Sequence, residues 1–388
     1  MSAKRALSEF RAPDETAAEE RAWTIVRCAQ FDGLRTPARR RSRWRLAIAP
    51  ALAVLAAAVA LSPAGASVRR WIGHELGVEH AAPALFSLPA PGRLLVSGPG
   101  GTWIANADGS TRRLGSWPQA SWSPRGLYVA VAGGDELAAV DPHGTPRWTL
   151  ARPAVSDPRW YAPTGFRIAY LSGIDLRVVA GNGTGDHLLA AGVASVAPAW
   201  RPGHPYQLAY LTRRGTLVVR DADTGRLDWT AHPRDARALA WSANGRQLLV
   251  LARARVAVYD GDGRAIATIS TPANAPILDA SLSPDGQALA LVRGGHAADV
   301  VLANLDGAKP RLRRVLSGVG LGALAWSPDG RWLLVTWPSA DQWVFVRVAG
   351  TPRIAAVSRI AEQFAPGRAP PGSPALDGWC CTTQGAAG

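Results

Sequence analysis

Short apolar runs separated by Gly, Pro, Asn and Asp recur along most of this 388-residue chain. Pairs of such runs lie between the turns, as in RQLLVLA followed by RVAVYD, and YQLAYLT followed by TLVVRDA. Short apolar runs bounded by turn residues are typical of β-strands, and Asn-, Asp- and Gly-rich segments between them are typical of tight turns. From residue 84 to about residue 358 the pattern therefore predicts an all-β domain of short strands.

A turn of the form W-S-P-D-G returns at regular spacing through this region. Seven anchor residues precede its copies, 34, 38, 40, 41, 41 and 44 residues apart: Leu88, Trp122, Trp160, Trp200, Trp241, Leu282 and Trp326. A second turn, such as DPHG or DADTG, keeps the same spacing, so each unit is expected to hold four strands. Because one such unit cannot bury both its faces alone, the units predict a β-propeller of seven four-stranded blades. Six blades are the alternative if the Leu88 unit only completes the ring.

The W-S-P-D-G turn followed by an alternating strand resembles the TolB-like and WD-repeat-like propeller family, over residues 84 to about 358. The segments PHGTPRWTL and DADTGRLDWTA also resemble the closing strand of quinoprotein-type repeats, where a turn Gly precedes a Trp. The resemblance implies a propeller and says little about activity, because propellers host many functions. Leu282 and the copies PRWYAPTG and PAWRPG depart from the pattern, which leaves individual blade boundaries open.

An uncharged run of 23 residues, 46–68, precedes the repeats. At about 1.5 Å per residue, a helix of this length matches the roughly 30 Å hydrocarbon core of a membrane. Five arginines lie directly before it: Arg39, Arg40, Arg41, Arg43 and Arg45. Only two follow it closely, so the positive-inside rule places residues 1–45 in the cytoplasm and the propeller outside the cytoplasmic membrane. Cleavage after Ala66 is the alternative, but the preceding charged region would exceed a whole signal peptide of about 15–30 residues.

The remaining segments complete a five-part layout. Residues 13–31 begin with Pro and acidic residues and carry an apolar stripe, which predicts a short cytoplasmic helix within residues 1–45. Residues 69–83 are interpreted as a juxtamembrane linker, and residues 359–388 as a Pro/Gly-rich tail outside the propeller. A short cytoplasmic segment, a span and an outer domain resemble the layout of membrane-anchored anti-sigma factors, in layout alone.

The charge of +14 raises the question of nucleic-acid binding. The main arginine cluster is explained by the span, and a propeller outside the cytoplasm would not meet nucleic acid. No G-x-S-x-G, H-E-x-x-H or G-x-x-x-x-G-K-[ST] motif occurs. GNGTGD at 181–186 and DGDG at 260–263 superficially resemble nucleotide and calcium loops, but both fall where the repeat has its second turn, so we expect hairpins.

Histidine and cysteine placement predicts no metal and no cofactor. His74 and His80 are six residues apart, which does not place them on one helix face as an i, i+4 pair would be. Cys28 has no neighbouring Cys or His. Cys380 and Cys381 are adjacent and can form a disulfide, but we interpret them as thiols of the tail.

Together these observations predict a non-enzymatic, membrane-anchored propeller that binds a protein or a small ligand outside the cell membrane. A variant of this hypothesis couples outer binding to a cytoplasmic partner. The alternative is an extracytoplasmic enzyme, such as a quinone-dependent dehydrogenase, a lyase or a hydrolase. Its site would be assembled in the central channel from residues far apart in sequence.

Overall fold

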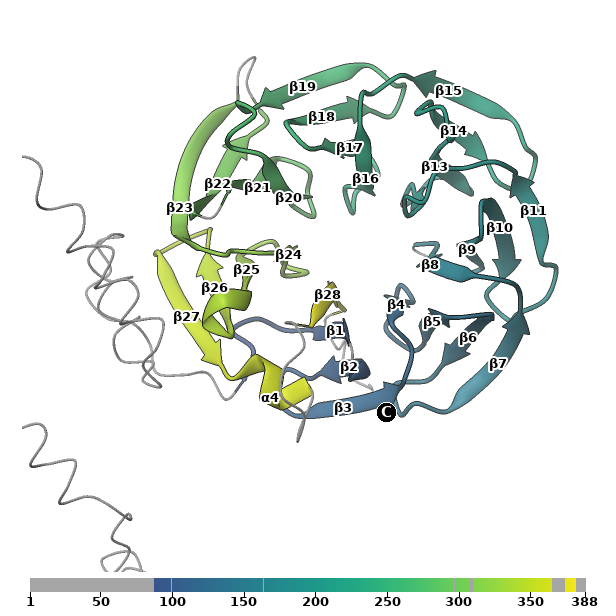
Figure 1. Cartoon of the computed structure of the whole chain (residues 1–388), viewed down its shortest axis with the longest axis horizontal. Coiled ribbons are helices and arrows are strands. Elements are labelled where there is room, and N and C mark those ends of the chain that lie inside the picture. The colour runs from purple at the N-terminus through teal and green to yellow at the C-terminus, as the bar shows by residue number, and fades with distance from the viewer. Residues whose placement is uncertain are drawn as a thin grey trace, which may run out of the picture. The chain divides into compact units, whose positions relative to one another are not determined.

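The computed structural model describes residues 87–98, 100–162, 164–295, 297–306, 310–364 and 374–381. In these residues seven antiparallel four-stranded sheets stand around a central axis as the blades of a propeller (Figure 1). The prediction of an all-β fold with seven blades is therefore confirmed, and the six-blade alternative is wrong. Helical structure in the described ranges is limited to the short elements η1 (Pro338–Ala340) and α4 (Ile360–Phe364).

Each blade runs from an innermost strand at the axis to an outermost strand at the rim (Figure 1). Blade 1 comprises β28 (Ala375–Cys380), β1 (Arg93–Gly98), β2 (Gly101–Ala105) and β3 (Thr111–Gly115). Blade 2 comprises β4 (Gln119–Trp122), β5 (Val129–Gly133), β6 (Glu136–Val140) and β7 (Pro146–Ala151). Blade 3 comprises β8 (Val155–Trp160), β9 (Arg167–Ser172), β10 (Asp175–Ala180) and β11 (His187–Ala190). Blade 4 comprises β12 (Ala199–Trp200), β13 (Gln207–Leu211), β14 (Leu217–Asp221) and β15 (Leu227–Ala231).

The other three blades follow in chain order. Blade 5 comprises β16 (Ala236–Trp241), β17 (Gln247–Ala252), β18 (Arg255–Asp260) and β19 (Ala265–Ser270). Blade 6 comprises β20 (Ile277–Leu282), β21 (Ala288–Gly294), β22 (Ala297–Asn304) and β23 (Arg311–Val319). Blade 7 comprises β24 (Leu324–Trp326), β25 (Trp332–Trp337), β26 (Gln342–Arg347) and β27 (Arg353–Ser358).

The anchor residues of blades 2 to 7 end the innermost strands, as the repeat predicts. In blade 7, Trp326 lies opposite Leu333 across the W-S-P-D-G turn. The corresponding pairs are Trp122 with Val129, Trp160 with Ile168, Trp200 with Leu208, Trp241 with Leu248, and Leu282 with Leu289. Some anchors also link neighbouring blades, since the Trp326 indole Nε1 donates to the Ser281 carbonyl oxygen at 3.0 Å.

Blade 1 corrects two predictions. Its anchor position, opposite Leu94, is held by Trp379 and not by Leu88, which precedes β1. Residues 375–380 were predicted to belong to a tail but form β28, the innermost strand of the first blade. The chain closes the ring by pairing its C-terminal strand with β1. The regular spacing of the repeats along the sequence does not reveal this pairing, because β1 and β28 lie at opposite ends of the repeat region.

The hydrophobic core is divided among the seven interfaces between neighbouring blades. Alternate residues of a central strand face opposite neighbours, as expected for a pleated strand. In β1, Leu94 and Val96 pack against blade 7, whereas Leu95 packs against blade 2. Each blade is therefore stabilised mainly by its neighbours, which explains why one unit alone would not be stable.

The two segments that resemble quinoprotein-type repeats supply a further contact between blades. Trp148 of β7 donates from Nε1 to the Gly181 carbonyl oxygen at 2.9 Å, and Trp229 of β15 donates to Gly261 at 3.0 Å. A Cβ on Gly263, whose φ is +84°, would lie 2.6 Å from the Trp229 ring. The outermost-strand Trp thus docks on a glycine-containing turn of the following blade.

The structure leaves the predicted membrane segment untested. The cytoplasmic segment 1–45 with Arg39 to Arg45, the span 46–68 and the linker 69–83 lie outside the described residues. Within the residues that are described, no helix is long and apolar enough to cross a membrane.

Candidate functional site

The turns of blades 5 to 7, which read W-S-A-N-G, L-S-P-D-G and W-S-P-D-G, use their polar side chains to hold the turn itself. In blade 6 the Ser283 hydroxyl donates to Asp285 Oδ1 at 2.5 Å and accepts the Ala288 N–H at 2.9 Å. The Gln287 N–H also donates to Asp285, at 3.0 Å. The hydrogen bond from Ser283 is the main reason why the pKa of Asp285 is lowered. These Ser–Asp pairs are turn-forming groups, which accounts for their recurrence without invoking catalysis.

Blade 2 departs from this pattern. Its turn has the same length as that of blade 6. Six residues lie between Trp122 and its partner Val129, and six lie between Leu282 and its partner Leu289. The register places Arg125 where blade 6 has Asp285, and Leu127 where it has Gln287. Arg125 is exposed, and its side chain has no hydrogen bond or ion pair with any described residue. Leu127 is 58% exposed. Neither side chain therefore serves the turn.

The same departure continues into the next two blades. Counted back from the second strand, the position of Leu127 is held by Phe166 in blade 3 and by Tyr206 in blade 4. Phe166 is 61% exposed. Blades 5, 6 and 7 carry polar residues there, namely Arg246, Gln287 and Arg331. Three consecutive blades thus present large apolar or aromatic side chains where blades 5 to 7 are polar and blade 1 has Gly92. Exposed apolar patches commonly mark binding sites.

This row lines a groove of about 990 Å³, which we call the aromatic groove. Its lining comes from blades 2, 3 and 4: Ser123, Pro124, Arg125, Leu127, Tyr128, Ala139, Arg147, Trp148, Trp160, Thr164, Gly165, Phe166, Arg167, Ala180, Gly181, Asn182 and Tyr206. The volume lies at the upper end of the roughly 300–1,000 Å³ typical of ligand sites.

Packing holds the aromatic rings of the groove in place. Tyr128 stacks on Trp160, with ring centroids 6.2 Å apart and an interplanar angle of 19°. Tyr206 packs against the Tyr161 ring at 5.1 Å, and the Arg167 guanidinium lies over Tyr206 at 4.7 Å from its centroid. A groove with ordered aromatic walls loses little side-chain entropy on binding, which favours affinity.

The groove is basic, but most of its charge is neutralised within the chain. Among the described residues, its lining includes three arginines and no Asp or Glu. Arg147 pairs with Asp141 at 2.9 Å, and Arg167 pairs with Asp223 at 2.8 Å. Arg125 alone among these three has no ion-pair partner in the described part of the chain. The groove therefore offers one uncompensated cation beside an apolar surface.

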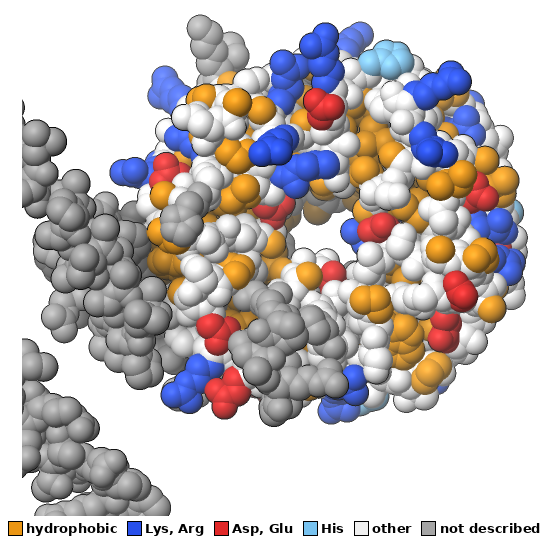
Figure 2. Space-filling model, in the orientation of Figure 1, with side chains coloured by type: hydrophobic (Ala, Val, Ile, Leu, Met, Phe, Trp, Pro, Cys, Tyr) orange, Lys and Arg blue, Asp and Glu red, His pale blue; other side chains and the backbone are white. Residues whose placement is uncertain are grey.

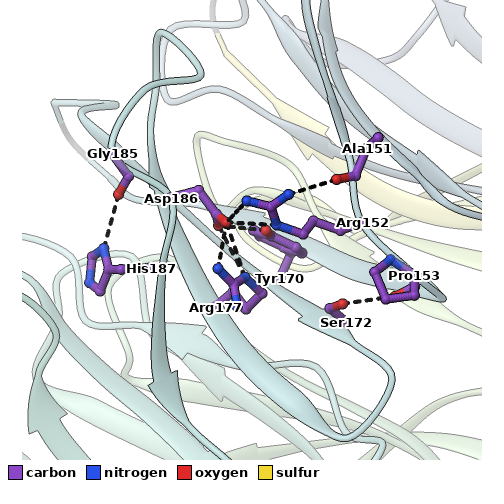
Figure 3. A network of polar contacts seen from close by, with 9 residues as sticks. All are labelled: Ala151, Arg152, Pro153, Tyr170, Ser172, Arg177, Gly185, Asp186 and His187. Carbon is purple, nitrogen blue, oxygen red and sulfur yellow. Dashed lines mark hydrogen bonds and ion pairs between the residues drawn. The ribbon is translucent and has the colours of Figure 1, made fainter.

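The GNGTGD segment forms a hairpin, as predicted. It joins β10 to β11, and the Gly183 N–H donates to the Ala180 carbonyl oxygen. Its last residue, Asp186, is the centre of a polar network whose side chains converge on one carboxylate (Figure 3). The DGDG segment likewise joins β18 to β19.

The Asp186 network ties blade 2 to blade 3. The Tyr170 hydroxyl donates to Asp186 Oδ1 at 2.5 Å, and Arg177 Nη2 and Arg152 Nη2 lie 2.6 and 2.7 Å from Oδ2 (Figure 3). Burial alone would raise the pKa of Asp186, but the hydrogen bonds from Arg177, Tyr170 and Arg152 lower it overall. Burial raises the pKa of Tyr170. The Tyr170 hydroxyl and the guanidinium groups of Arg177 and Arg152 all bind the Asp186 carboxylate, so we assign the network a structural role.

The central opening of the ring carries acidic and basic side chains at its border (Figure 2). Two innermost strands carry a carboxyl whose pKa is raised by burial, Asp279 of β20 and Asp377 of β28. Desolvation by surrounding protein raises the pKa of Asp377 to about 7, although solvent reaches the side chain and both the Ser97 hydroxyl and the Arg159 charge act in the opposite direction. No group of three or more His, Cys, Asp or Glu within the described ranges could hold a metal ion.

The cysteine pair lies in a blade and not in a tail. Cys380 and Cys381 are joined by a disulfide at the end of β28. The Cys381 Sγ lies 3.4 Å from the Pro124 carbonyl oxygen, in the turn of blade 2. The pair therefore helps to seat the closing strand against the neighbouring blade.

Comparison with known proteins supports the fold. No family model matches the chain, and no curated protein matches it. Among solved structures, Kluyveromyces lactis Hsv2 is similar with a TM-score of 0.54 and 13% identity, covering 69% of this chain and 96% of that one. The β-propeller domain of Myceliophteria thermophila Cps50 (Swd1) gives 0.52 and 16%, covering 66% and 90%. A chain of a mitotic checkpoint complex gives 0.52 and 18%, covering 66% and 85%. At these identities the likeness shows the propeller fold alone.

Proposed function

We propose that this chain is a non-enzymatic scaffold that binds a protein partner through the aromatic groove. The observation that carries the proposal is the row Leu127, Phe166 and Tyr206, set at one turn position of three consecutive blades, in which Leu127 and Phe166 are exposed and Tyr206 is half-buried. A rigid ring holds such turn residues in fixed geometry, which suits a recognition surface. One of the similar structures, a mitotic checkpoint complex, is by its description an assembly of proteins. That likeness supports a protein partner only by analogy of fold.

The proposal also includes attachment to the cytoplasmic membrane. Residues 46–68 act as a single anchoring helix, with residues 1–45 in the cytoplasm and the propeller outside. The support is the uncharged run next to the Arg39 to Arg45 cluster. In this arrangement residues 1–45 relay occupancy of the groove to a cytoplasmic partner. The W-S-P-D-G turns support a distant relationship to TolB-like and WD-repeat-like propellers.

Co-purification from native membranes tests the binding surface. The full chain is compared with Phe166→Gln and with a matched control, Leu312→Gln, which changes an exposed leucine of β23 in blade 6. We expect the same partner to be recovered with the wild type and the control and to be lost with Phe166→Gln. Recovery with all three proteins, or loss with both variants, would contradict the groove as the binding surface.

A reporter fusion tests the topology. Alkaline phosphatase, which is active outside the cytoplasm, is joined after residue 388 of the full chain or after residue 34. We expect activity from the first fusion only. Activity from the second fusion, or from neither, would contradict the proposed orientation. The binding result does not depend on this one, because the groove is formed entirely by the propeller.

A further inference from the structure

We infer that the aromatic groove takes an extended peptide segment carrying one carboxylate next to an aromatic or large aliphatic side chain. The inference rests on the proposed function, because it specifies the chemistry of the partner at the same groove. It follows from three features: an arginine, Arg125, that has no ion-pair partner among the described residues, exposed apolar side chains at Leu127 and Phe166, and a volume sufficient for a few residues.

Arg125 defines the charge of the ligand. In blades 6 and 7 the corresponding Asp285 and Asp329 accept hydrogen bonds that hold the turn. Blade 2 keeps its turn without them, since Ser123 Oγ still accepts the Tyr128 N–H at 2.9 Å. At this position blade 2 carries an exposed arginine where blades 6 and 7 carry an aspartate that holds the turn. The arginine reverses the charge and makes no hydrogen bond with the described residues of the turn. A guanidinium that is free to form two parallel hydrogen bonds is well suited to a carboxylate.

The apolar part of the ligand is set by Leu127, Tyr128 and Phe166, which are 58%, 40% and 61% exposed. These side chains and Arg125 line the same groove, so a single short segment can contact both kinds of group. Aromatic residues at the centre of a groove are frequent sources of binding energy, and charged groups beside them set register and specificity.

The charge count favours a peptide over single-stranded nucleic acid, whose bases could also stack on these rings. Binding a nucleic-acid strand requires several cations that follow successive phosphates. Arg147 and Arg167 are already paired with Asp141 and Asp223. Of the three arginines, only Arg125 remains to bind a ligand. One cation can pair with one carboxylate, but it is too few to bind the successive phosphates of a nucleic-acid strand.

The test uses the full chain in detergent micelles and short peptides with blocked ends, labelled with an uncharged boron-dipyrromethene dye and followed by fluorescence anisotropy. The parent peptide is Gly-Ser-Glu-Phe-Ser-Gly, and its companions replace Glu by Gln, Glu by Lys, or Phe by Ala. A short oligothymidylate with the same label is included. We expect the parent peptide to bind, and the companions and the oligothymidylate to bind at least tenfold more weakly.

Variants of the protein separate charge from fold. Arg125→Asp restores the residue that blades 6 and 7 carry at this turn position, so it should fold normally. We expect it to lose the Glu peptide by at least tenfold, equivalent to about 1.4 kcal/mol, and to prefer the Lys peptide. Arg246→Gln, an exposed arginine in the turn of blade 5, serves as the matched control and should leave binding unchanged.

Each adverse outcome overturns a defined part of the inference. Equal binding of the Glu and Gln peptides, or no change with Arg125→Asp, would show that a carboxylate is not recognised. Equal or tighter binding of oligothymidylate would replace the peptide by nucleic acid. If no peptide binds while a partner still co-purifies in a Phe166-dependent way, this inference fails and the proposed function stands; if neither is observed, both fail.

Discussion

Replacing Trp379 with Ala is expected to lower the free energy of unfolding of the propeller by about 3–5 kcal/mol. Trp379 holds the anchor position of blade 1 and is 8% exposed. Its ring packs edge to face against Phe345 of blade 7, with centroids 5.6 Å apart. The strand that carries it closes the ring, so the substitution acts on the contact between the two ends of the propeller.

The magnitude follows from burial. A buried Trp removes roughly 200 Å² from water, which at about 25 cal/mol per Å² corresponds to about 5 kcal/mol. The Nε1–H of Trp379 is buried and has no hydrogen-bond partner among the described residues, so its removal sacrifices no hydrogen bond. That places the expected loss in the lower half of the range. Trp379→Phe keeps an aromatic ring and deletes the unpaired N–H, so it should cost only about 1 kcal/mol.

Urea unfolding of the full chain, followed by near-ultraviolet circular dichroism, measures these differences. Leu88→Ala is the matched control, because Leu88 is the residue that linear spacing would select as the first anchor. Leu88 precedes β1 and is only partly buried, so we expect it to cost about 1 kcal/mol or less. Equal losses for Leu88→Ala and Trp379→Ala would refute the assignment of Trp379 as the seventh anchor.

Three further predictions concern contacts between blades and the titration of two carboxyls. Trp229→Phe loses one hydrogen bond, so the free energy of unfolding should fall by about 1 kcal/mol. Gly263→Ala places a Cβ against the same ring at a positive φ, so it should lower the free energy of unfolding by more. The urea midpoints of the two variants test this order. The folded-state pKa of Asp186 is lowered, so its stabilising contribution should be present above about pH 4 and decline as the pH falls through its folded pKa. Asp186→Asn should therefore differ most from the wild type near neutral pH. The pKa of Asp377 is raised to about 7, so the wild type should lose stability relative to Asp377→Asn as the pH rises from about 4 to about 7.

The blade architecture could be predicted because each W-S-P-D-G turn is specified locally. In blade 6, the hydrogen bonds of Ser283, Asp285 and Gly286 all run to partners within a few residues of one another. The closing strand could not be predicted in this way. Trp379 lies opposite Leu94 on the adjacent strand, although nearly the whole propeller sequence separates the two residues. No local sequence pattern identifies such a distant partner.

The candidate site was only partly accessible from the sequence. The departure W-S-P-R-G at Arg125 can be read directly by comparing the turns. The alignment of Phe166 and Tyr206 with Leu127 required the strand register, because the turns of blades 3 and 4 contain one more residue than that of blade 2. Exposure of these side chains also depends on neighbouring blades, which single-repeat patterns do not describe.

Site-specific photo-crosslinking tests the central claim most directly. A photoreactive phenylalanine is introduced at Phe166 or, as the matched control, at Gln287, the same turn position in blade 6. Both full-length proteins are irradiated in native membranes. If the aromatic groove is the partner surface, position 166 yields a discrete adduct with one protein and position 287 yields none. Identical adducts from both positions, or an adduct from position 287 alone, would contradict the account.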